Sequence, residues 1–413
     1  MKYILVTGGE GFIGKHLVKR LKSLGHNVMT VDLSVDADYT FDICDATNFH
    51  VLDNIDIDIV YHLAAQSYGR GSLDDPHKDL DWNALGTLNV CLYAWKNNIN
   101  KIVYTSTMAV YGNGDLSKET DNLNPLSNYA CSKLCGEFYI KRFAEYGIDY
   151  TIFRVFNTYG PGQDLSNKNK GIVNAFISQV MNDTTINVTG SLDRYRDLTY
   201  VDDMVNALVL GLDNKTRNET INACSSVKTH IGELIDTIIV ASGRDGDFNV
   251  NNIGGHSGDQ HGSTGDNSKL KSLGWKLETP LTDGLKKVWS SLSPEPTYAF
   301  FNDVELFALM KDSDFENVKT IVCPSYLHSH WAKLEGVCNN DETHFYELAN
   351  IFPGRFDNVD FLPYELHPGD NDRPEEVKRI SEGGQPAPAL DKWPGSTGGT
   401  AACWLSKYAG YRD

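Results

Sequence analysis

The chain has 413 residues, too many for one ordinary hydrophobic core, so we expect two or three domains. Its net charge of −18 argues against a nucleic acid or an anionic membrane as a partner, and no apolar run approaches the ~20 residues that span a bilayer. The eight cysteines follow no disulfide framework, which favours reduced thiols in a cytoplasmic protein.

The chain begins with a strand, a glycine turn and a helix in that order. A strand is expected at Tyr3–Val6, the turn is Thr7-Gly-Gly-Glu-Gly-Phe-Ile-Gly14, and a helix is expected at Lys15–Leu24. Glycines let the backbone approach phosphates closely, and the N–H groups at the helix N-terminus face their negative charge. A second strand, Val28–Asp32, ends in a carboxylate that can bind ribose hydroxyls and would repel the 2′-phosphate of NADP. The sequence therefore predicts an NAD site.

Strand and helix patterns alternate up to about residue 160. Further strands are expected at Ile59–Leu63, Lys101–Thr105 and Tyr150–Arg154, and further helices at Asp79–Asn97 and Tyr129–Tyr146. Such alternation is typical of an α/β fold, a Rossmann-like doubly wound parallel sheet with helices on both faces. Ligands of these sheets bind beyond the carboxyl ends of the strands.

The pattern divides the chain into three parts. Residues 1–160 are expected to form the NAD-binding Rossmann domain. Residues 161–292 are expected to form a smaller mixed domain, mainly substrate-binding and interleaved with the first, that closes with a helix at Leu281–Leu292. Ser293-Pro-Glu-Pro296 is a predicted linker to a C-terminal extension, 297–413, of different composition.

The extension offers few signals. We expect a helix at Asp303–Met310 and a strand at Thr320–Cys323. His328, His330 and neighbouring cysteines match no standard zinc spacing, so no metal site is expected. The segment Pro394-Gly-Ser-Thr-Gly-Gly-Thr400, before an expected helix at 401–408, resembles the Ser-Thr-Gly turn of some sialyltransferase-like proteins. An appended glycosyltransferase-like module and a structural or oligomerisation extension both stay open, and we favour the second.

Three side chains predict alcohol oxidation by NAD. Tyr129 and Lys133 are four residues apart and so lie on one helix face, and Thr107 follows the strand that begins at Lys101. A tyrosine has a pKa near ~10 and becomes a base at neutral pH only when a cation stabilises its phenolate. Lys133 and the nicotinamide ring can supply that charge, and the Thr107 hydroxyl can orient the substrate oxygen.

Over about residues 1–290 the chain resembles the extended short-chain dehydrogenase/reductase family. The motifs that carry the resemblance are Thr7-Gly8-x-x-Gly11-x-x-Gly14, Asp42-Ile43-x-Asp45, Asn83-x-x-Gly86-Thr87, Thr107, Tyr129-x-x-x-Lys133, Arg154-x-Phe156-Asn157-x-Tyr159-Gly160-Pro161, Arg196-Asp197-x-x-Tyr200-Val201-Asp202, and Gly258-Asp259 with Asp266-x-Ser268-Lys269. Within it, the segments 104–112 and 190–197 look like those of NAD-dependent nucleotide-sugar 4-epimerases of the UDP-glucose/UDP-galactose type.

The resemblance implies a role for each matching residue. Tyr129 would be the acid/base, Lys133 its charged partner and Thr107 the hydroxyl partner, and Thr107, Asn157 and Arg196 would bind substrate. The residues implied to contact NAD are Gly8, Gly11, Phe12, Ile13, Gly14, Asp32, Asp42, Ile43, Leu63, Ala64, Ala65, Gln66, Asn83, Thr105, Tyr129, Lys133 and Phe156. The family also implies a homodimer that packs through the helices expected at 79–97 and 129–146.

Two departures from the family pattern bear on the reaction. Family dehydratases and decarboxylases carry an acid just after the Ser/Thr, whereas this chain has Met108 and Ala109, which disfavours a dehydratase. Many epimerases place a phosphate-binding arginine two residues before the Gly-Asp, where this chain has His256 and Ser257. A protonated His256 could replace that arginine, but a solvated loop histidine is the favoured interpretation, and the nucleotide stays open.

The favoured function is inversion of C4 of a UDP-hexose through a transient 4-keto sugar. Another keto-sugar reaction, by a 2-epimerase or a dehydratase, is the first alternative. A non-catalytic NAD-binding regulatory protein is the second, and the intact Thr107, Tyr129 and Lys133 argue against it because a sensor needs no acid/base group. The sequence does not identify the sugar.

Overall fold

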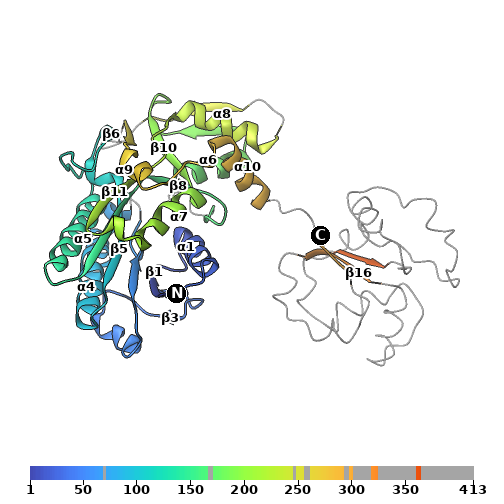
Figure 1. The fold of residues 1–413 in the computed structure, drawn as a ribbon. Helices are drawn as coiled ribbons and strands as arrows, with labels where there is room; N and C mark the ends of the chain where they lie inside the picture. Colours follow the sequence, from blue (N-terminus) through green and yellow to red (C-terminus); the bar gives the residue numbers. More distant parts are fainter. Residues whose placement is uncertain are drawn as a thin grey trace, which may run out of the picture. The chain divides into compact units, whose positions relative to one another are not determined.

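The computed structural model describes residues 1–67, 71–165, 171–244, 248–254 and 261–292 in full, and three backbone strands beyond them. The chain separates into two compact units, Met1–Leu292 and Ser293–Asp413 (Figure 1). No helix of the described residues is long and apolar enough to cross a membrane.

A parallel sheet of seven strands forms the centre of the first unit. Its order is β11-β7-β5-β4-β1-β2-β3, and every neighbouring pair is parallel. The central strands β4 and β5 are buried at every position, as expected for a sheet that is covered on both faces. The bounds are β1 Tyr3–Thr7, β2 Asn27–Asp32, β3 Tyr39–Thr40, β4 Ile59–His62, β5 Lys101–Thr107, β7 Asp149–Val155 and β11 Glu219–Ala223.

Helices cover both faces of this sheet, with α4 and α5 on one side and α1 and α7 on the other (Figure 1). Alternate residues of β1 face the two sides, so that Ile4 and Val6 enter one core cluster and Leu5 enters the other. The predicted Rossmann-like doubly wound fold is confirmed. The helices are α1 Phe12–Ser23, α4 Gly86–Lys96, α5 Asn128–Ala144 and α7 Val201–Val209.

A smaller set of strands lies beyond the carboxyl ends of the large sheet. The strand order is β12-β10-β14-β6, with β8 also paired to β10, and β9 pairs separately with β13. The bounds are β6 Gly114–Ser117, β8 Asn157–Tyr159, β9 Thr185–Val188, β10 Tyr195–Tyr200, β12 Lys228–His230, β13 Asn249–Asn252, β14 Gly262–Gly265, and for the helices α6 Ile172–Asn182, α8 Ile231–Ser242, α9 Ser268–Ser272 and α10 Leu281–Leu292.

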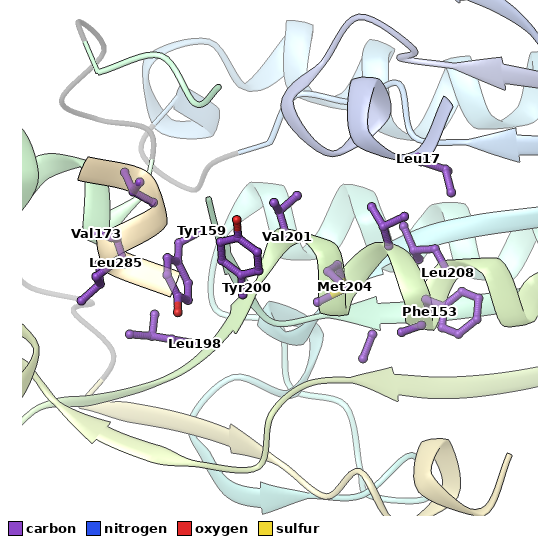
Figure 2. Packing of buried hydrophobic residues seen from close by; sticks show 14 of the residues in the cluster. Leu17, Phe153, Tyr159, Val173, Leu198, Tyr200, Val201, Met204, Leu208 and Leu285 are labelled. Atoms are coloured by element: carbon purple, nitrogen blue, oxygen red, sulfur yellow. The ribbon is translucent and has the colours of Figure 1, made fainter. Parts of the chain in front are cut away.

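One hydrophobic cluster joins the two sets of strands. It runs from Leu17 on α1 past Met204 on α7 to Tyr159 on β8 and Leu285 on α10 (Figure 2). The chain also crosses between the sheets, because β6 comes from the first 160 residues while β11, from later in the chain, is an edge strand of the large sheet. The contacts therefore group residues 1–292 as one unit.

The segment expected to be a helix at Asp79–Asn97 is helical up to Lys96, but the helix starts earlier and contains a π turn. The structure has α3 (Pro76–Leu80), a π-helical turn η2 (Asp81–Leu85) and then α4. The helix starts early because Asp75 caps it, accepting a hydrogen bond from the Lys78 N–H at 3.0 Å, and Pro76 suits the first helical position. The π turn coincides with Asn83, a buried side chain that bonds outside the helix to the Gln66 N–H and to Ser132.

In the second unit only strands are described. β15 (Thr297–Phe300), β16 (Val318–Cys323) and β17 (Asp360–Pro363) form a parallel sheet in that order. The strand predicted at Thr320–Cys323 is confirmed within β16. The helices expected at 303–310 and 401–408, the Ser-Thr-Gly turn and the histidines from His328 lie outside the described residues.

A buried ion pair fastens α5 to the sheet. Glu137 of α5 and Arg154 of β7 are almost fully buried and form two hydrogen bonds of 2.9 Å, Nε to Oε1 and Nη2 to Oε2. The Ser106 hydroxyl on β5 donates to the same carboxylate at 2.6 Å. Burial alone would raise the pKa of Glu137, but the Arg154 guanidinium and the Ser106 hydroxyl hold it below its usual value.

We expect Arg154→Met to lower the free energy of unfolding by about 3–5 kcal/mol, because it removes the buried cation of Glu137 and leaves only the half-exposed Lys141, 3.3 Å from the carboxylate. Thermal and urea unfolding of the full chain measure this. Arg142→Met, which breaks the exposed pair with Glu145 on the same helix, is the control and should cost about 0–1 kcal/mol. Equal losses in the two variants would contradict the structural role of the pair.

Candidate active site

A cavity of about 1400 Å³ lies at the carboxyl ends of the central strands. It extends from the glycine turn after β1, past the ends of β2, β4, β5 and β7, to β10 of the smaller sheet. Of the predicted site residues it is lined by Gly8, Gly11, Phe12, Ile13, Gly14, Asp32, Asp42, Ile43, Leu63, Ala64, Ala65, Thr105, Thr107, Tyr129, Lys133, Phe156, Asn157 and Arg196. The structure therefore brings together segments that are nearly 200 residues apart.

The glycine turn has the shape that a pyrophosphate requires. Gly8 adopts φ +73°, and a Cβ there would lie 2.6 Å from the backbone nitrogen of Ala64. A Cβ at Gly14 would overlap the carbonyl oxygen of Gly8. Gly11 begins α1 without any side-chain cap, so the first N–H groups of the helix point into the turn with no side chain in front of them. This cradle fits the diphosphate of a dinucleotide.

Asp32 closes one side of this cradle. Its Oδ2 accepts a hydrogen bond from the Glu10 N–H at 3.0 Å, and its Oδ1 accepts one from the Ser34 N–H at 3.2 Å. These bonds hold the carboxylate at the end of β2, beside the turn. Asp42 and Ile43 follow β3 and line the cavity on the same side. A carboxylate in this place suits ribose hydroxyls and opposes a 2′-phosphate.

Gln66 and Asn83 do not line the cavity, although both were expected to contact the cofactor. Asn83 is fully buried, and its Oδ1 accepts a hydrogen bond from the Gln66 N–H at 2.8 Å. Its Nδ2 donates to Ser132 Oγ at 3.0 Å and to Asp79 Oδ1 at 3.2 Å. Asn83 thus shapes the turn after β4 from behind.

Thr107, Tyr129 and Lys133 meet in the same cavity. Thr107 ends β5, and Ser127 caps α5 by accepting a hydrogen bond from the Ala130 N–H at 3.1 Å, which places Tyr129 in the first turn and Lys133 one turn later. The Thr107 side chain interacts with the Tyr129 phenol and favours its ionised form, which lowers the pKa of Tyr129. The Lys133 Nζ lies 4.3 Å from the centre of the Tyr104 ring, a cation–π contact.

Burial controls the protonation of this group. Burial raises the pKa of Tyr129 to about 12, the Asp79 charge raises it further, and the interaction with Thr107 lowers it. Burial lowers the pKa of Lys133 to about 7, while the Glu137 and Asp79 carboxylates raise it. Without ligands, Tyr129 is therefore a neutral phenol and Lys133 is only partly protonated near pH 7.

The other end of the cavity is formed by the smaller sheet. Arg196 on β10 donates from Nη1 to the Tyr195 carbonyl at 2.7 Å, and Asn157 on β8 donates to the Asp197 carbonyl at 3.3 Å. Asp197 has a buried carboxylate that accepts hydrogen bonds from the Ser225 N–H and hydroxyl and from the N–H groups of Ser226 and Gly265. Asp197 thus fixes the strand that carries Arg196.

Several cavity residues belong to no motif and were missed by the sequence analysis. They come from helices, strands and loops that fold into the cleft: Leu73, Trp82, Leu126, Gln163, Val173 and Leu198. His256 and Ser257, which replace the usual arginine, lie outside the described residues. Among the described residues, no three His, Cys, Asp or Glu side chains come together as a metal site would require.

We expect Lys133→Met to raise the free energy of unfolding of the cofactor-free protein by on the order of 3–5 kcal/mol near and below pH 7, because the buried lysine has a pKa of about 7 instead of 10.5. The unfolded chain binds the proton more tightly, so the gain should shrink as the pH rises from 7 towards 10.5. Urea unfolding at several pH values measures it.

Lys19→Met is the control, since this exposed lysine lies on the surface of α1, away from the site. Its effect should be small and nearly independent of pH. A Lys133→Met protein that is less stable than the native chain at pH 6 would contradict the burial of a strained ammonium.

Comparisons with known proteins agree with this geometry. The profile of the family described as "NAD dependent epimerase/dehydratase family" matches residues 4–224. A candidate UDP-glucose 4-epimerase of Methanocaldococcus jannaschii is 35% identical over 299 residues, which cover 69% of this chain and 96% of that protein. A UDP-glucuronic acid decarboxylase 1 of Xenopus tropicalis is 28% identical, over 69% of this chain and 71% of its own length.

Solved structures give the same result. A UDP-glucose 4-epimerase of Thermotoga maritima with UDP-glucose is 30% identical, with a TM-score of 0.67 over 70% of this chain and 98% of that one. A UDP-glucose 4-epimerase of Thermus thermophilus in complex with NAD is 26% identical, with a TM-score of 0.66 over 71% and 99% of the two chains. The chain belongs to the NAD-dependent epimerase/dehydratase family, and NAD is its cofactor.

Proposed function

We propose that the protein inverts C4 of a UDP-hexose through a 4-keto sugar. The observation that carries this proposal is the composition of the cavity wall around Thr107 and Tyr129. In the described part of that wall the neighbouring side chains are Met108, Ala109, Leu126 and Ser127, and none of them carries a carboxyl group. Simple oxidation and reduction at one carbon needs only Tyr129 as acid/base, whereas elimination of water needs a further acid.

When bound, NAD supplies the reversible hydride acceptor that oxidation of a carbinol requires. Tyr129 takes the proton from the C4 hydroxyl, and Thr107 orients the same oxygen by a hydrogen bond. Since burial raises the pKa of Tyr129 to about 12, the phenol ionises near neutral pH only when positive charge is added beside it, as the oxidised nicotinamide ring would do. Added charge of that kind is therefore part of the proposed mechanism.

The two ends of the cavity suit different tasks. Arg196 and Asn157 would hold the diphosphate, and the forked donors of arginine suit phosphate oxygens. The sugar end, near Met108 and Ala109, offers few polar groups in the described residues. A 4-keto sugar held by its diphosphate could turn over there and be reduced on its other face, when Tyr129 returns the proton. The reaction has no net oxidation.

The other keto-sugar reactions stay as alternatives because relatives include a decarboxylase. The decarboxylase and dehydratase reactions begin with the same oxidation at C4 and differ in the second step. The purified protein should therefore be incubated with UDP-glucose, UDP-N-acetylglucosamine and UDP-glucuronate without added reductant, and the sugars separated by chromatography. We expect a C4-inverted product from at least one of them. A dehydrated or decarboxylated product would replace the proposal with one of the alternatives.

We expect Tyr129→Phe to lower turnover by about 10²–10⁴-fold, since it removes the acid/base group and leaves the ring in place. NAD should stay bound, and its absorbance in the purified protein measures this. Tyr111→Phe is a suitable control, because that buried tyrosine bonds Asn222 and Arg154 away from the reaction. Turnover of Tyr129→Phe within a few-fold of the native rate would rule out Tyr129 as the acid/base.

We also infer a homodimer formed through α4 and α5. Three large apolar side chains are about half exposed or more: Trp95 on α4, Phe138 on α5 and Tyr146 just after α5. Because the family resemblance implies a homodimer, we infer that a second copy of the chain covers these side chains. Light scattering of the native chain should give twice the monomer mass at micromolar concentration, and Phe138→Asp should give the monomer mass. A monomeric native chain would contradict the inference.

A further inference from the structure

A buried carboxylate lies behind the proposed catalytic group. Asp79 lies near the end of α3, and this residue is only 1% exposed. Its Oδ2 accepts a hydrogen bond from Ser132 Oγ at 2.7 Å, and its Oδ1 accepts one from Asn83 Nδ2 at 3.2 Å. Asp79 does not line the cavity, so it contacts neither cofactor nor substrate there.

The two partners of Asp79 lie on different elements and are also hydrogen-bonded to each other, Asn83 Nδ2 donating to Ser132 Oγ at 3.0 Å. Ser132 is on α5 between Tyr129 and Lys133, and its hydroxyl also lies 3.0 Å from the Tyr129 carbonyl. Asn83 accepts a hydrogen bond from the Gln66 N–H at 2.8 Å and so holds the turn after β4. Asp79 therefore bonds both members of a direct link between α5 and the turn after β4, and so reinforces that link.

Asp79 differs from Glu137, the other buried acid of this region. Glu137 is paired with Arg154, which neutralises most of its charge. No ion pair within 4.0 Å that involves Asp79 is found among the described residues. Its charge acts instead through the protein interior on Lys133 and Tyr129.

The charged groups near Asp79 can be named from each packed element. On α2 (Gly71–Asp74), on its own segment and on η2 the titratable side chains are exposed to solvent, which screens them: Asp74, Asp75, His77, Lys78 and Asp81. The titratable groups on α5 that share its buried surroundings are Tyr129, Lys133 and Glu137. Solvent screening leaves Lys133 and Tyr129 as the main targets of the Asp79 charge.

We propose that Asp79 is a positioning residue that locks α5 to the Gln66 turn through Ser132 and Asn83, and that its negative charge keeps Lys133 protonated beside Tyr129. The proposal rests on the proposed function, since it assigns Asp79 a task in setting up that acid/base pair. It adds a residue that matches none of the family motifs found in the sequence.

The first test is Asp79→Asn, which can keep both hydrogen bonds because its oxygen accepts from Asn83 while its amide donates to Ser132. Loss of the negative charge lowers the pKa of Tyr129 and of Lys133 together. The pH profile of kcat/KM on a UDP-hexose should therefore move to lower pH by about one unit. Turnover at pH 7 should fall roughly 3–10-fold, because less of Lys133 is protonated at that pH.

Matched variants separate the charge from the hydrogen bonds. Ser132→Ala breaks the link to α5 but keeps the charge, so it should reduce turnover or NAD retention without moving the pH profile. Asp81→Asn removes an exposed charge two residues away and should change neither turnover nor the pH profile. A profile for Asp79→Asn that coincides with that of the native protein would overturn the charge role. Unchanged turnover and NAD retention in Ser132→Ala would overturn the positioning role.

A second readout does not depend on turnover. The phenolate absorbance of Tyr129 in the NAD-loaded protein, taken as the difference from Tyr129→Phe, can be titrated with and without Asp79→Asn. We expect the variant to titrate about one pH unit lower. If the native protein acts on no UDP-hexose but this shift is observed, the role of Asp79 stands and the proposed function fails. If the shift is absent, the charge role of Asp79 fails whatever the substrate.

Discussion

The whole site depends on burying a phenol and an ammonium side by side on one helix face. Water stabilises the charged form of each group, and burial removes that stabilisation. The pKa of Tyr129 therefore rises to about 12, while that of Lys133 falls to about 7. The fold accepts this cost because α5 is fixed by other contacts, above all the pair of Glu137 and Arg154. Because Tyr129 and Lys133 are buried together, a charge that enters the cavity shifts the protonation equilibria of both.

The two sides of the cavity are built from different materials. On the cofactor side the contacts are mostly backbone and small side chains, and the close approach of Gly8 to Ala64 leaves no room for anything larger. At the other end the polar side chains of Asn157 and Arg196 come from the smaller sheet, on strands fixed by the buried Asp197. A rigid cradle and a separate anchor for the diphosphate are what a tightly kept cofactor and an exchanging substrate would need.

Much of this could be predicted from the sequence because the constraints are local. The turn that ends at Gly14 has to be glycine-rich for steric reasons, and Tyr129 and Lys133 share a face by helical spacing alone. The π turn between α3 and α4 was not predicted, because it depends on the hydrogen bond between Asn83 and the Gln66 turn, which is distant in sequence. Asp79 was missed for the same reason, since only the packing of α3 against α5 shows that this carboxylate is buried.

The central claim is that Tyr129 becomes a base only when positive charge joins it in the cavity. The most direct measurement is the phenolate absorbance of Tyr129, taken as the difference between the native protein and Tyr129→Phe, with NAD removed and with NAD restored. We predict no phenolate up to about pH 10 without NAD, and a pKa lower by roughly two units or more with it. Identical titrations in the two states would contradict the account.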